Sequence, residues 1–311
     1  MARVLARIDA GAVDVAPRHR AIVRRWRTVL DEHGAAPGVS WDDVVAVGEG
    51  LGQTPLDRFF ARCDEHLEEL VSDDVRLQAL LFDEGSEDAV SVLYSANPIS
   101  ELTNAAAGEE VRAIALETAP EPARILEIGA GTGATTGPVL DAVADQPLDY
   151  RFTDVSEWFL ERARTTFAGR SGMSFGLYDL NAIDPPLGPW DGVVAGNVLH
   201  NVTDPVAFFR RLRPRMSERG RLVLVETGTE HHPLLISMRF MMSPPPEDPD
   251  RGFTDARSGD GRIFLTPAEW EAAASSAGWT VLSRVPDDAH PLAWLGQFTL
   301  VLGVDDSVAS P

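Results

Sequence analysis

A string of eight residues, Leu126-Glu-Ile-Gly-Ala-Gly-Thr-Gly133, constrains the fold of this chain more than any other part of its sequence. A short, mostly apolar run, Arg124-Ile-Leu-Glu-Ile128, leads directly into the three glycines, and an amphipathic stretch follows them. The three glycines therefore stand where a strand turns into a helix. Glycine permits both a tight turn and the close approach of a ligand to the backbone. We predict a buried strand, a ligand-binding turn and a helix.

The residues after Ala123 alternate between short apolar runs and amphipathic stretches, which implies a mostly parallel sheet covered by helices on both faces. The last two apolar runs have no helix between them and are expected to form an antiparallel pair at one edge. We predict an α/β fold with a seven-stranded Rossmann-like sheet and an antiparallel last strand. The predicted strands cover residues 124–128, 150–153, 173–178, 191–195, 221–226, 280–284 and 298–302.

The residues before the sheet read as helical, with apolar residues at helical spacing. We predict a helical N-terminal lid or substrate subdomain over 1–118 and a Rossmann-like domain over 119–311. A segment at about 229–265 breaks the alternation and is predicted to be a lid insertion, with a disordered surface insert as the alternative. Met238 and Met241 within it can line an apolar substrate pocket, although core packing requires the same spacing. The predicted N-terminal helices cover residues 19–30, 56–70, 88–94 and 99–116.

The ligand of the glycine turn is indicated by three acidic residues. With Ala134 the string also satisfies Gly-x-Gly-x-x-Ala, a pattern of dinucleotide-binding turns. A carboxylate at Glu127 would repel a pyrophosphate but can approach a cationic methionyl group. Asp154, 21 residues after Gly133, can bind both hydroxyls of a ribose, and Asp179 can accept from an adenine amino group. We therefore predict S-adenosylmethionine, with S-adenosylhomocysteine as product, rather than NAD(P). The predicted cofactor-binding residues are Glu127, Gly129, Gly131, Gly133, Asp154, Val155, Asp179, Leu180 and Asn197.

A candidate base follows the fourth predicted strand. His200 lies at the carboxyl edge of the sheet, where ligands bind in doubly wound folds. Imidazole, with an ordinary pKa near 6.5, suits a base at cellular pH. Glu226 ends the adjacent strand and can hold the tautomer of the imidazole. The alternatives are that His200 only bonds within its loop and that Glu226 is a structural partner.

The motifs resemble the methyltransferase domains of nonribosomal peptide and polyketide synthases, which have the class I methyltransferase fold. In similar carbon methyltransferases this histidine and this glutamate form the catalytic dyad, which the resemblance places at His200 and Glu226. It also places Tyr94 and Asn104 in a helical lid that faces the cofactor or substrate, with ordinary helix packing as the alternative for each residue. The chain lacks carrier, condensation and adenylation segments, so we expect a free-standing relative. The resembling stretches are RILEIGAGTGATTGPVL, YRFTDVSEWFLERAR, WDGVVAGNVLHN and SMRFMMSPP.

Composition excludes several classes of partner. The chain of 311 residues has 48 acidic and 27 basic residues, and a net charge of −21 repels nucleic acids and anionic membranes. No apolar run is long enough to cross a membrane and no signal peptide is present, so we expect a cytoplasmic protein. Cys63 is the only cysteine and is predicted to be buried. The histidines show no metal-ligand spacing, so no metal is expected.

The reaction predicted from these residues is carbon methylation of a small-molecule or carrier-linked intermediate in secondary metabolism, such as antibiotic biosynthesis. A carbon acid needs a base, which the histidine and glutamate supply. The main alternative is an O- or N-methyltransferase of a small secondary metabolite, because a hydroxyl also reacts through a histidine base. A methyltransferase-like scaffold without activity would need neither the acids nor His200, and an oxidoreductase would instead bind a nicotinamide cofactor.

Overall fold

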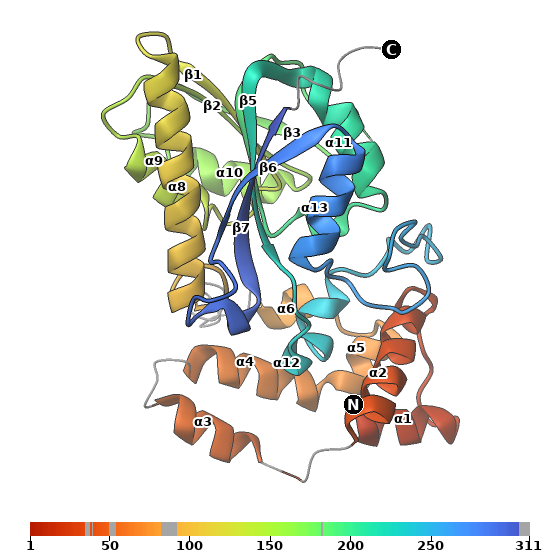
Figure 1. Cartoon of the computed structure of the whole chain (residues 1–311). Helices are drawn as coiled ribbons and strands as arrows, with labels where there is room; N and C mark the ends of the chain where they lie inside the picture. The colour runs from red at the N-terminus through yellow and green to blue at the C-terminus, as the bar shows by residue number, and fades with distance from the viewer. Residues whose placement is uncertain (35–37, 39, 50–53, 82–91, 182, 305–311) are drawn as a thin grey trace. The chain divides into compact units, whose positions relative to one another are not determined.

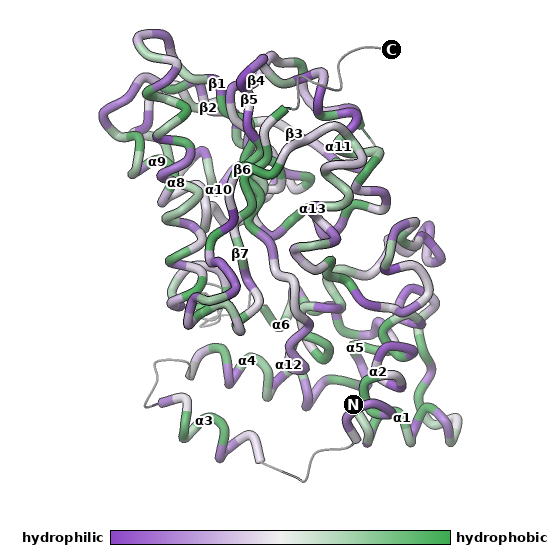
Figure 2. Tube along the Cα trace, viewed as in Figure 1, coloured by the Kyte–Doolittle hydropathy of each residue, from purple (hydrophilic) through white to green (hydrophobic). Residues whose placement is uncertain are grey.

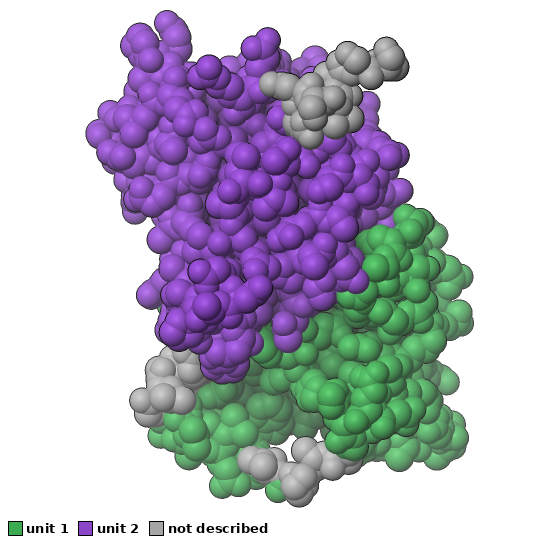
Figure 3. Space-filling view, in the orientation of Figure 1, with its two compact units in different colours: residues 1–96, 230–263 green, residues 97–229, 264–311 purple. Residues whose placement is uncertain are grey.

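A computed structural model of the chain describes residues 1–34, 38, 40–49, 54–81, 92–181 and 183–304 (Figure 1). The chain forms two compact units, which Figure 3 colours separately. Unit 1 comprises residues 1–96 and 230–263, and unit 2 comprises residues 97–229 and 264–311. Among the described residues, no helix has the length and apolar character needed to cross a membrane.

Unit 2 is built on a seven-stranded sheet with the strand order β3-β2-β1-β4-β5-β7-β6. Strands β1 to β5 pair in parallel, whereas β7 is antiparallel to both β5 and β6. The predicted α/β class, strand number and antiparallel edge pair are confirmed. The strands are β1 (Ala123–Ile128), β2 (Leu148–Asp154), β3 (Met173–Leu177), β4 (Trp190–Gly196), β5 (Met216–Thr227), β6 (Trp279–Val285) and β7 (Gln297–Val304).

Both faces of the sheet are buried, so its central strands are apolar at consecutive positions and not only at alternate ones (Figure 2). On β4, Val193 packs into a cluster with the residues of α11 and α13, while its neighbour Val194 packs with α8 and α9. α10 packs on β2 and β3. The helices of unit 2 are α8 (Pro98–Thr118), α9 (Thr136–Ala142), α10 (Glu157–Thr166), α11 (Pro205–Leu212) and α13 (Pro267–Ser276), with 3₁₀ turns η2 (Leu199–Asn201), η3 (Arg213–Arg215) and η5 (Ala293–Leu295).

Helix α8 shows why the two units divide before residue 97 and not at the predicted residue 118. Val111 and Ile114 of α8 are buried in the same cluster as Ile125 of β1. The helix also packs along α9 and against β7. Although the sequence of α8 continues the N-terminal helical pattern, its apolar face covers the sheet. It therefore groups with unit 2.

The described part of unit 1 is helical and has its own apolar core. Trp26 is fully buried in this core, and its indole N–H donates to the carbonyl of Leu235, 2.9 Å away. Cys63 is buried there as predicted. The predicted helix at 88–94 falls largely outside the described residues. The elements are α1 (Ala2–Asp9), η1 (Pro17–His19), α2 (Arg20–His33), α3 (Trp41–Glu49), α4 (Thr54–Glu65), α5 (Leu67–Ser72), α6 (Leu77–Leu81), α12 (His232–Leu235) and η4 (Met238–Phe240).

Candidate active site

The glycine turn between β1 and α9 has the conformation that its sequence predicts. Gly129, Gly131 and Gly133 have φ angles of 59°, 55° and 82°, in the left-handed region that favours glycine. A Cβ atom on Gly129 would lie 2.2 Å from Cγ2 of Val198, closer than two carbon atoms can approach. The turn also delays the helix, which begins at Thr136. The sequence pattern predicts that this helix covers about 132–143, and the observed helix starts later because the left-handed glycines extend the turn.

Asp154 ends β2 beside this turn. Its Oδ2 accepts from the backbone N–H of Gly131 at 2.9 Å, and its Oδ1 accepts from that of Ser156 at 2.8 Å. Burial raises the pKa of the Asp154 carboxyl, and the backbone N–H bonds oppose this shift. A carboxylate offers about four lone-pair sites, so two backbone bonds leave acceptor capacity for a ligand. Asp154 therefore fixes the turn and still suits the predicted ribose contact.

Glu127 is buried under the turn, with 1% of its surface exposed. Its Oε2 accepts from the hydroxyls of Thr136 at 2.6 Å and Tyr150 at 2.7 Å. Burial raises the pKa of the carboxyl from its ordinary 4.5 to about 7, although both hydroxyl bonds oppose the shift. These bonds tie the end of β1 to β2 and to the start of α9. Glu127 thus anchors the elements around the turn, a function that we did not predict.

The raised pKa makes a prediction about stability. Below pH 4.5 the carboxyl is protonated in both the folded and the unfolded state. Between pH 4.5 and 7 the unfolded chain loses this proton first, so the free energy of unfolding falls as the pH rises. Because the pKa rises from 4.5 to about 7, the loss is about 3 kcal/mol at 1.36 kcal/mol per unit. The variant Glu127→Gln keeps a neutral acceptor and should lack this loss.

Urea unfolding at pH 4.5 and pH 8 measures this effect. The other titrating groups are common to the wild type and Glu127→Gln, so their contributions cancel in the difference between the two proteins. Equal pH dependence in both proteins would show that Glu127 titrates normally in the fold.

Asn104 lies in α8 and has its side chain against the same turn. It is 3% exposed, and its Oδ1 accepts from the hydroxyl of Thr135 at 2.9 Å. A Cβ atom on Gly196, at the end of β4, would lie 2.5 Å from that hydroxyl oxygen. The resemblance placed Asn104 in a helical lid, but the structure places it in unit 2, where it supports the residue before α9.

Sequence analysis missed Thr135, Thr136 and Tyr150. A threonine after a glycine turn carries no distinctive pattern. For Tyr150, the alternation along β2 places it on the same face as Asp154, and β1 pairs in parallel so that Glu127 lies opposite Phe152. This register between β1 and β2 is set by tertiary packing and cannot be read from the sequence alone.

His200 and Glu226 meet at the carboxyl ends of β4 and β5. His200 lies in η2 and is 4% exposed, while Glu226 is fully buried near the end of β5. Nδ1 of His200 donates to Oε2 of Glu226 at 2.8 Å, and the backbone N–H of His200 donates to Oε1 at 3.0 Å. The ring of Phe264 packs edge-on against the imidazole at a centroid distance of 5.3 Å. The glutamate thus fixes both the position and the tautomer of the ring.

Asn197 connects this pair to the end of β4. Its φ angle is 49°, which is uncommon for a residue other than glycine. Its backbone N–H donates to the carbonyl of Val225 at 2.7 Å, and its Oδ1 accepts from the hydroxyl of Thr227 at 3.3 Å. The turn after β4 is therefore held against the end of β5, and Val198 of the same turn packs on Gly129.

The remaining predicted residues differ in their surroundings. Val155 is 65% exposed next to Asp154, whereas Leu180 is 6% exposed and packs in the core of unit 2. Asp179 is half-buried, and its Oδ1 accepts from the backbone N–H of Asn181 at 2.9 Å. Leu180 therefore offers a ligand its backbone and not its side chain.

The predicted substrate residues of the insertion and lid lie in unit 1. Met238 is 3% exposed in the apolar core of that unit, and Tyr94 and Met241 pack against the same core. The spacing of the methionines was compatible with core packing as well as with a substrate pocket. The burial of Met238 is explained by core packing. A substrate contact by Tyr94 or Met241 stays a prediction.

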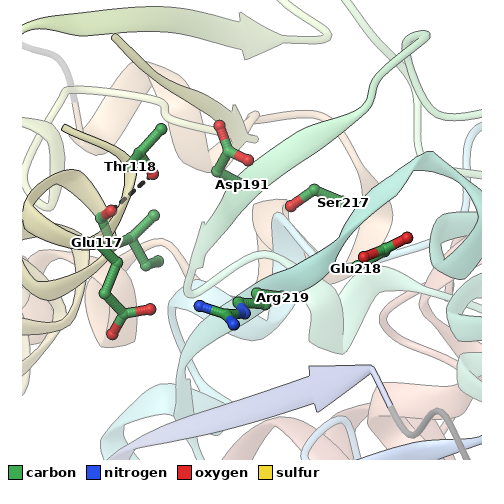
Figure 4. A pocket seen from close by; sticks show the side chains of 7 residues that line it. Glu117, Thr118, Asp191, Ser217, Glu218 and Arg219 are labelled. Atoms are coloured by element: carbon green, nitrogen blue, oxygen red, sulfur yellow. Dashed lines mark hydrogen bonds between the residues drawn. The ribbon is translucent and has the colours of Figure 1, made fainter. Parts of the chain in front are cut away.

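A pocket of about 480 Å³ lies at the opposite edge of the sheet, where β4 and β5 begin (Figure 4). Asp191 lines it and accepts from the backbone N–H of Arg124 at 3.0 Å. Glu117 also lines it and forms an ion pair with Arg221. These two carboxylates thus have structural partners, and the pocket is separate from the glycine turn. Among the described residues, no three His, Cys, Asp or Glu side chains cluster to hold a metal.

Comparisons with known proteins match this chain to large synthases. Residues 126–222 match the family model of a methyltransferase domain. The chain is 28% identical over 317 residues to pyochelin synthetase PchF of Pseudomonas aeruginosa, covering 92% of the chain and 17% of the synthetase. It is 33% identical over 303 residues to polyketide synthase ThaG of Burkholderia thailandensis, covering 90% of the chain and 5% of the synthase. The chain thus spans a small part of the length of these relatives.

Solved structures share the fold. The CurJ carbon methyltransferase superposes with a TM-score of 0.81 over 94% of this chain and 81% of that one, at 22% sequence identity. The similarity includes the helical N-terminal part as well as the sheet, since it covers nearly the whole chain.

Proposed function

We propose that the chain is an S-adenosylmethionine-dependent methyltransferase with the class I fold and that it methylates a carbon acid on an intermediate of natural-product biosynthesis. The intermediate is either a free small molecule or one linked to a carrier. The observation that carries this proposal is the buried pair of His200 and Glu226, which stands at the carboxyl edge of the sheet. The resemblance to methyltransferase domains within PchF and ThaG supports the class of substrate.

The residues around the glycine turn fit S-adenosylmethionine. The backbone at Gly129 has no room for a Cβ atom, because Val198 already fills that space. Asp154 retains acceptor capacity for ribose hydroxyls, and a cation nearby would favour the ionised form of Glu127. Asp179 and the backbone of Leu180 would hold the adenine, and Asn197 the amino-acid part. When bound, this cofactor supplies an electrophilic methyl group with its own leaving group.

His200 would remove the proton from the carbon acid. Its Nδ1 donates to Glu226, so the neutral ring carries its lone pair on Nε2. As Nε2 takes up the proton, the buried carboxylate of Glu226 stabilises the imidazolium. The deprotonated carbon would then be able to accept the methyl group that the bound cofactor supplies, and the bond between that methyl group and the cofactor's sulfur would break as the C–C bond forms. The edge of Phe264 against the ring restricts its motion and excludes water from that side.

The pair of His200 and Glu226 supplies the base that a carbon acid needs, and the comparisons support carbon over oxygen and nitrogen as the methylated atom. Hydroxyl groups also react through a histidine base, so O-methylation remains the alternative. The structural similarity to the CurJ carbon methyltransferase, 22% identical, supports a shared fold only. The relatives PchF and ThaG are synthases, which supports acyl intermediates with acidic α-carbons as acceptors.

Incubation with cofactor labelled in the methyl carbon tests this proposal. The acceptors are β-ketoacyl thioesters, offered both on a carrier protein and as short thiol esters, and small phenols and amines for comparison. We expect label on the α-carbon of a thioester, located by mass spectrometry and NMR. Label only on phenol oxygen or amine nitrogen would overturn carbon methylation while leaving the methyltransferase assignment intact.

A further inference from the structure

Arg239 is a buried cation in unit 1. It lies in η4 and is 5% exposed. Burial lowers the pKa of its guanidinium to about 10, which still leaves it charged at neutral pH. A buried charge is costly unless other groups compensate for it, so the surroundings of Arg239 require an explanation.

The protein supplies little compensation to this guanidinium. Its Nη1 donates to the carbonyl of Met242 at 3.4 Å, and its Nη2 donates to the carbonyl of Gly261 at 3.2 Å. Both distances are long for such bonds. Among the described residues, Nε of Arg239 has no acceptor, and no carboxylate lies within 4.0 Å of the group. These two hydrogen bonds therefore offset only part of the free-energy cost of removing the Arg239 guanidinium from water.

Two other arginines of unit 1, one buried and one partly buried, show what a compensated guanidinium looks like. Arg257 is 1% exposed, and its Nη2 lies 2.5 Å from Oδ2 of Asp255. Arg25 pairs with Glu230 at 2.7 Å. Glu230 also attracts Arg239 at longer range, but its second oxygen already accepts from the backbone N–H of Ile263.

A second arginine points its donors at the same short segment. Nη2 of Arg18 donates to the carbonyl of Ser243 at 3.4 Å, next along the chain from Met242, and its Nε also has no acceptor among the described residues. Its ion-pair partner is Asp73, at 3.9 Å, which also faces His19 and Arg76, and Glu247 attracts it at longer range. Burial lowers the pKa of His19 to about 4, so this ring is neutral.

From these contacts we propose that Arg239 and Arg18 form a binding site for an anionic oxygen group, a carboxylate or a phosphate. The guanidinium is suited to such groups because its planar donors match two oxygens at once. The ligand would carry the negative charge that Arg239 lacks and occupy the open Nε donors. Malonate carries such a carboxylate, and pantetheine 4′-phosphate carries such a phosphate.

The variant Arg239→Met tests the site through binding and stability, without any methyl transfer. Malonate, pantetheine 4′-phosphate and inorganic phosphate are titrated into the full-length protein by calorimetry. We expect malonate or pantetheine phosphate to bind the wild type at least tenfold more tightly than Arg239→Met. The stronger of the two ligands identifies the source of the charge. Equal affinities in both proteins, or binding of neither ligand, would overturn the site.

Stability separates this site from a structural arginine. A guanidinium without compensation makes the fold less stable, so Arg239→Met without ligand should melt at or above the temperature of the wild type. Arg257→Met removes a fully paired buried arginine and should melt lower, while exposed Arg27→Met should change little. If Arg239→Met melts as low as Arg257→Met, Arg239 is structural. These binding and melting measurements require no methyl transfer, so the anion site and the proposed function can be contradicted separately.

Discussion

His200→Ala is expected to lower kcat by roughly 10²- to 10⁴-fold, the usual contribution of a positioned base. The side chain is 4% exposed and held through Nδ1 and its backbone N–H, so its ring has a fixed orientation. A base held in a fixed orientation contributes more than its pKa, because it does not have to rotate into the reactive position before it accepts the proton. Cofactor affinity should change little, since the glycine turn is a separate element. Single-turnover rates with labelled cofactor, together with cofactor calorimetry, measure both quantities.

Two further measurements separate a base from a structural histidine. Added imidazole should partly restore the rate of His200→Ala, because a small base can enter the space left by the ring. Glu226→Gln should also lower kcat while the fold is retained, since an amide offers the Nδ1 hydrogen no charge and can present its own N–H instead. A variant His200→Ala that keeps nearly full turnover and binds cofactor normally would eliminate this residue as the base.

Much of the fold follows from the sequence because local patterns and global packing agree. Strands buried on both faces read as continuous apolar runs, and the missing helix between the last two strands predicts their antiparallel pairing. The division of the chain does not follow in the same way. α8 has a helical pattern like its N-terminal neighbours, and only its packing against Ile125 and β7 assigns it to the sheet.

The candidate site shows the same limit. His200 and Glu226 could be paired in advance, because parallel strands end at one edge, where His200 follows β4 and Glu226 lies near the end of β5. Glu127, Thr136 and Tyr150 could not, since their hydrogen bonds depend on the register between β1 and β2 and on where α9 begins. Arg239 was not predicted either. The possible function of Arg239 depends on the groups around it in the fold. The sequence alone does not show whether an acidic side chain lies near an arginine.

Gly129→Ala is expected to abolish detectable cofactor binding and to destabilise unit 2 by about 2–5 kcal/mol. The left-handed conformation at φ 59° costs a residue with a Cβ atom about 1–2 kcal/mol. The new methyl group would also meet Cγ2 of Val198 at 2.2 Å, and overpacking of this kind costs roughly 1–3 kcal/mol. Because Val198 belongs to the turn that precedes His200, relief of the clash would displace both ligand-facing turns. Urea unfolding and cofactor calorimetry measure the two effects.

Two other glycines of the same region supply matched controls for this substitution. Gly131→Ala meets nothing closer than 4.0 Å but keeps a positive φ of 55°, so it should lose only the conformational part, about 1–2 kcal/mol. Gly137→Ala lies in α9 with nothing within 4 Å and should stabilise the protein by about 0.5–1 kcal/mol. Comparison of the losses of unfolding free energy in Gly129→Ala, Gly131→Ala and Gly137→Ala thus separates the steric clash from the backbone strain. Equal effects at Gly129 and Gly131 would mean that Val198 does not pack on the turn.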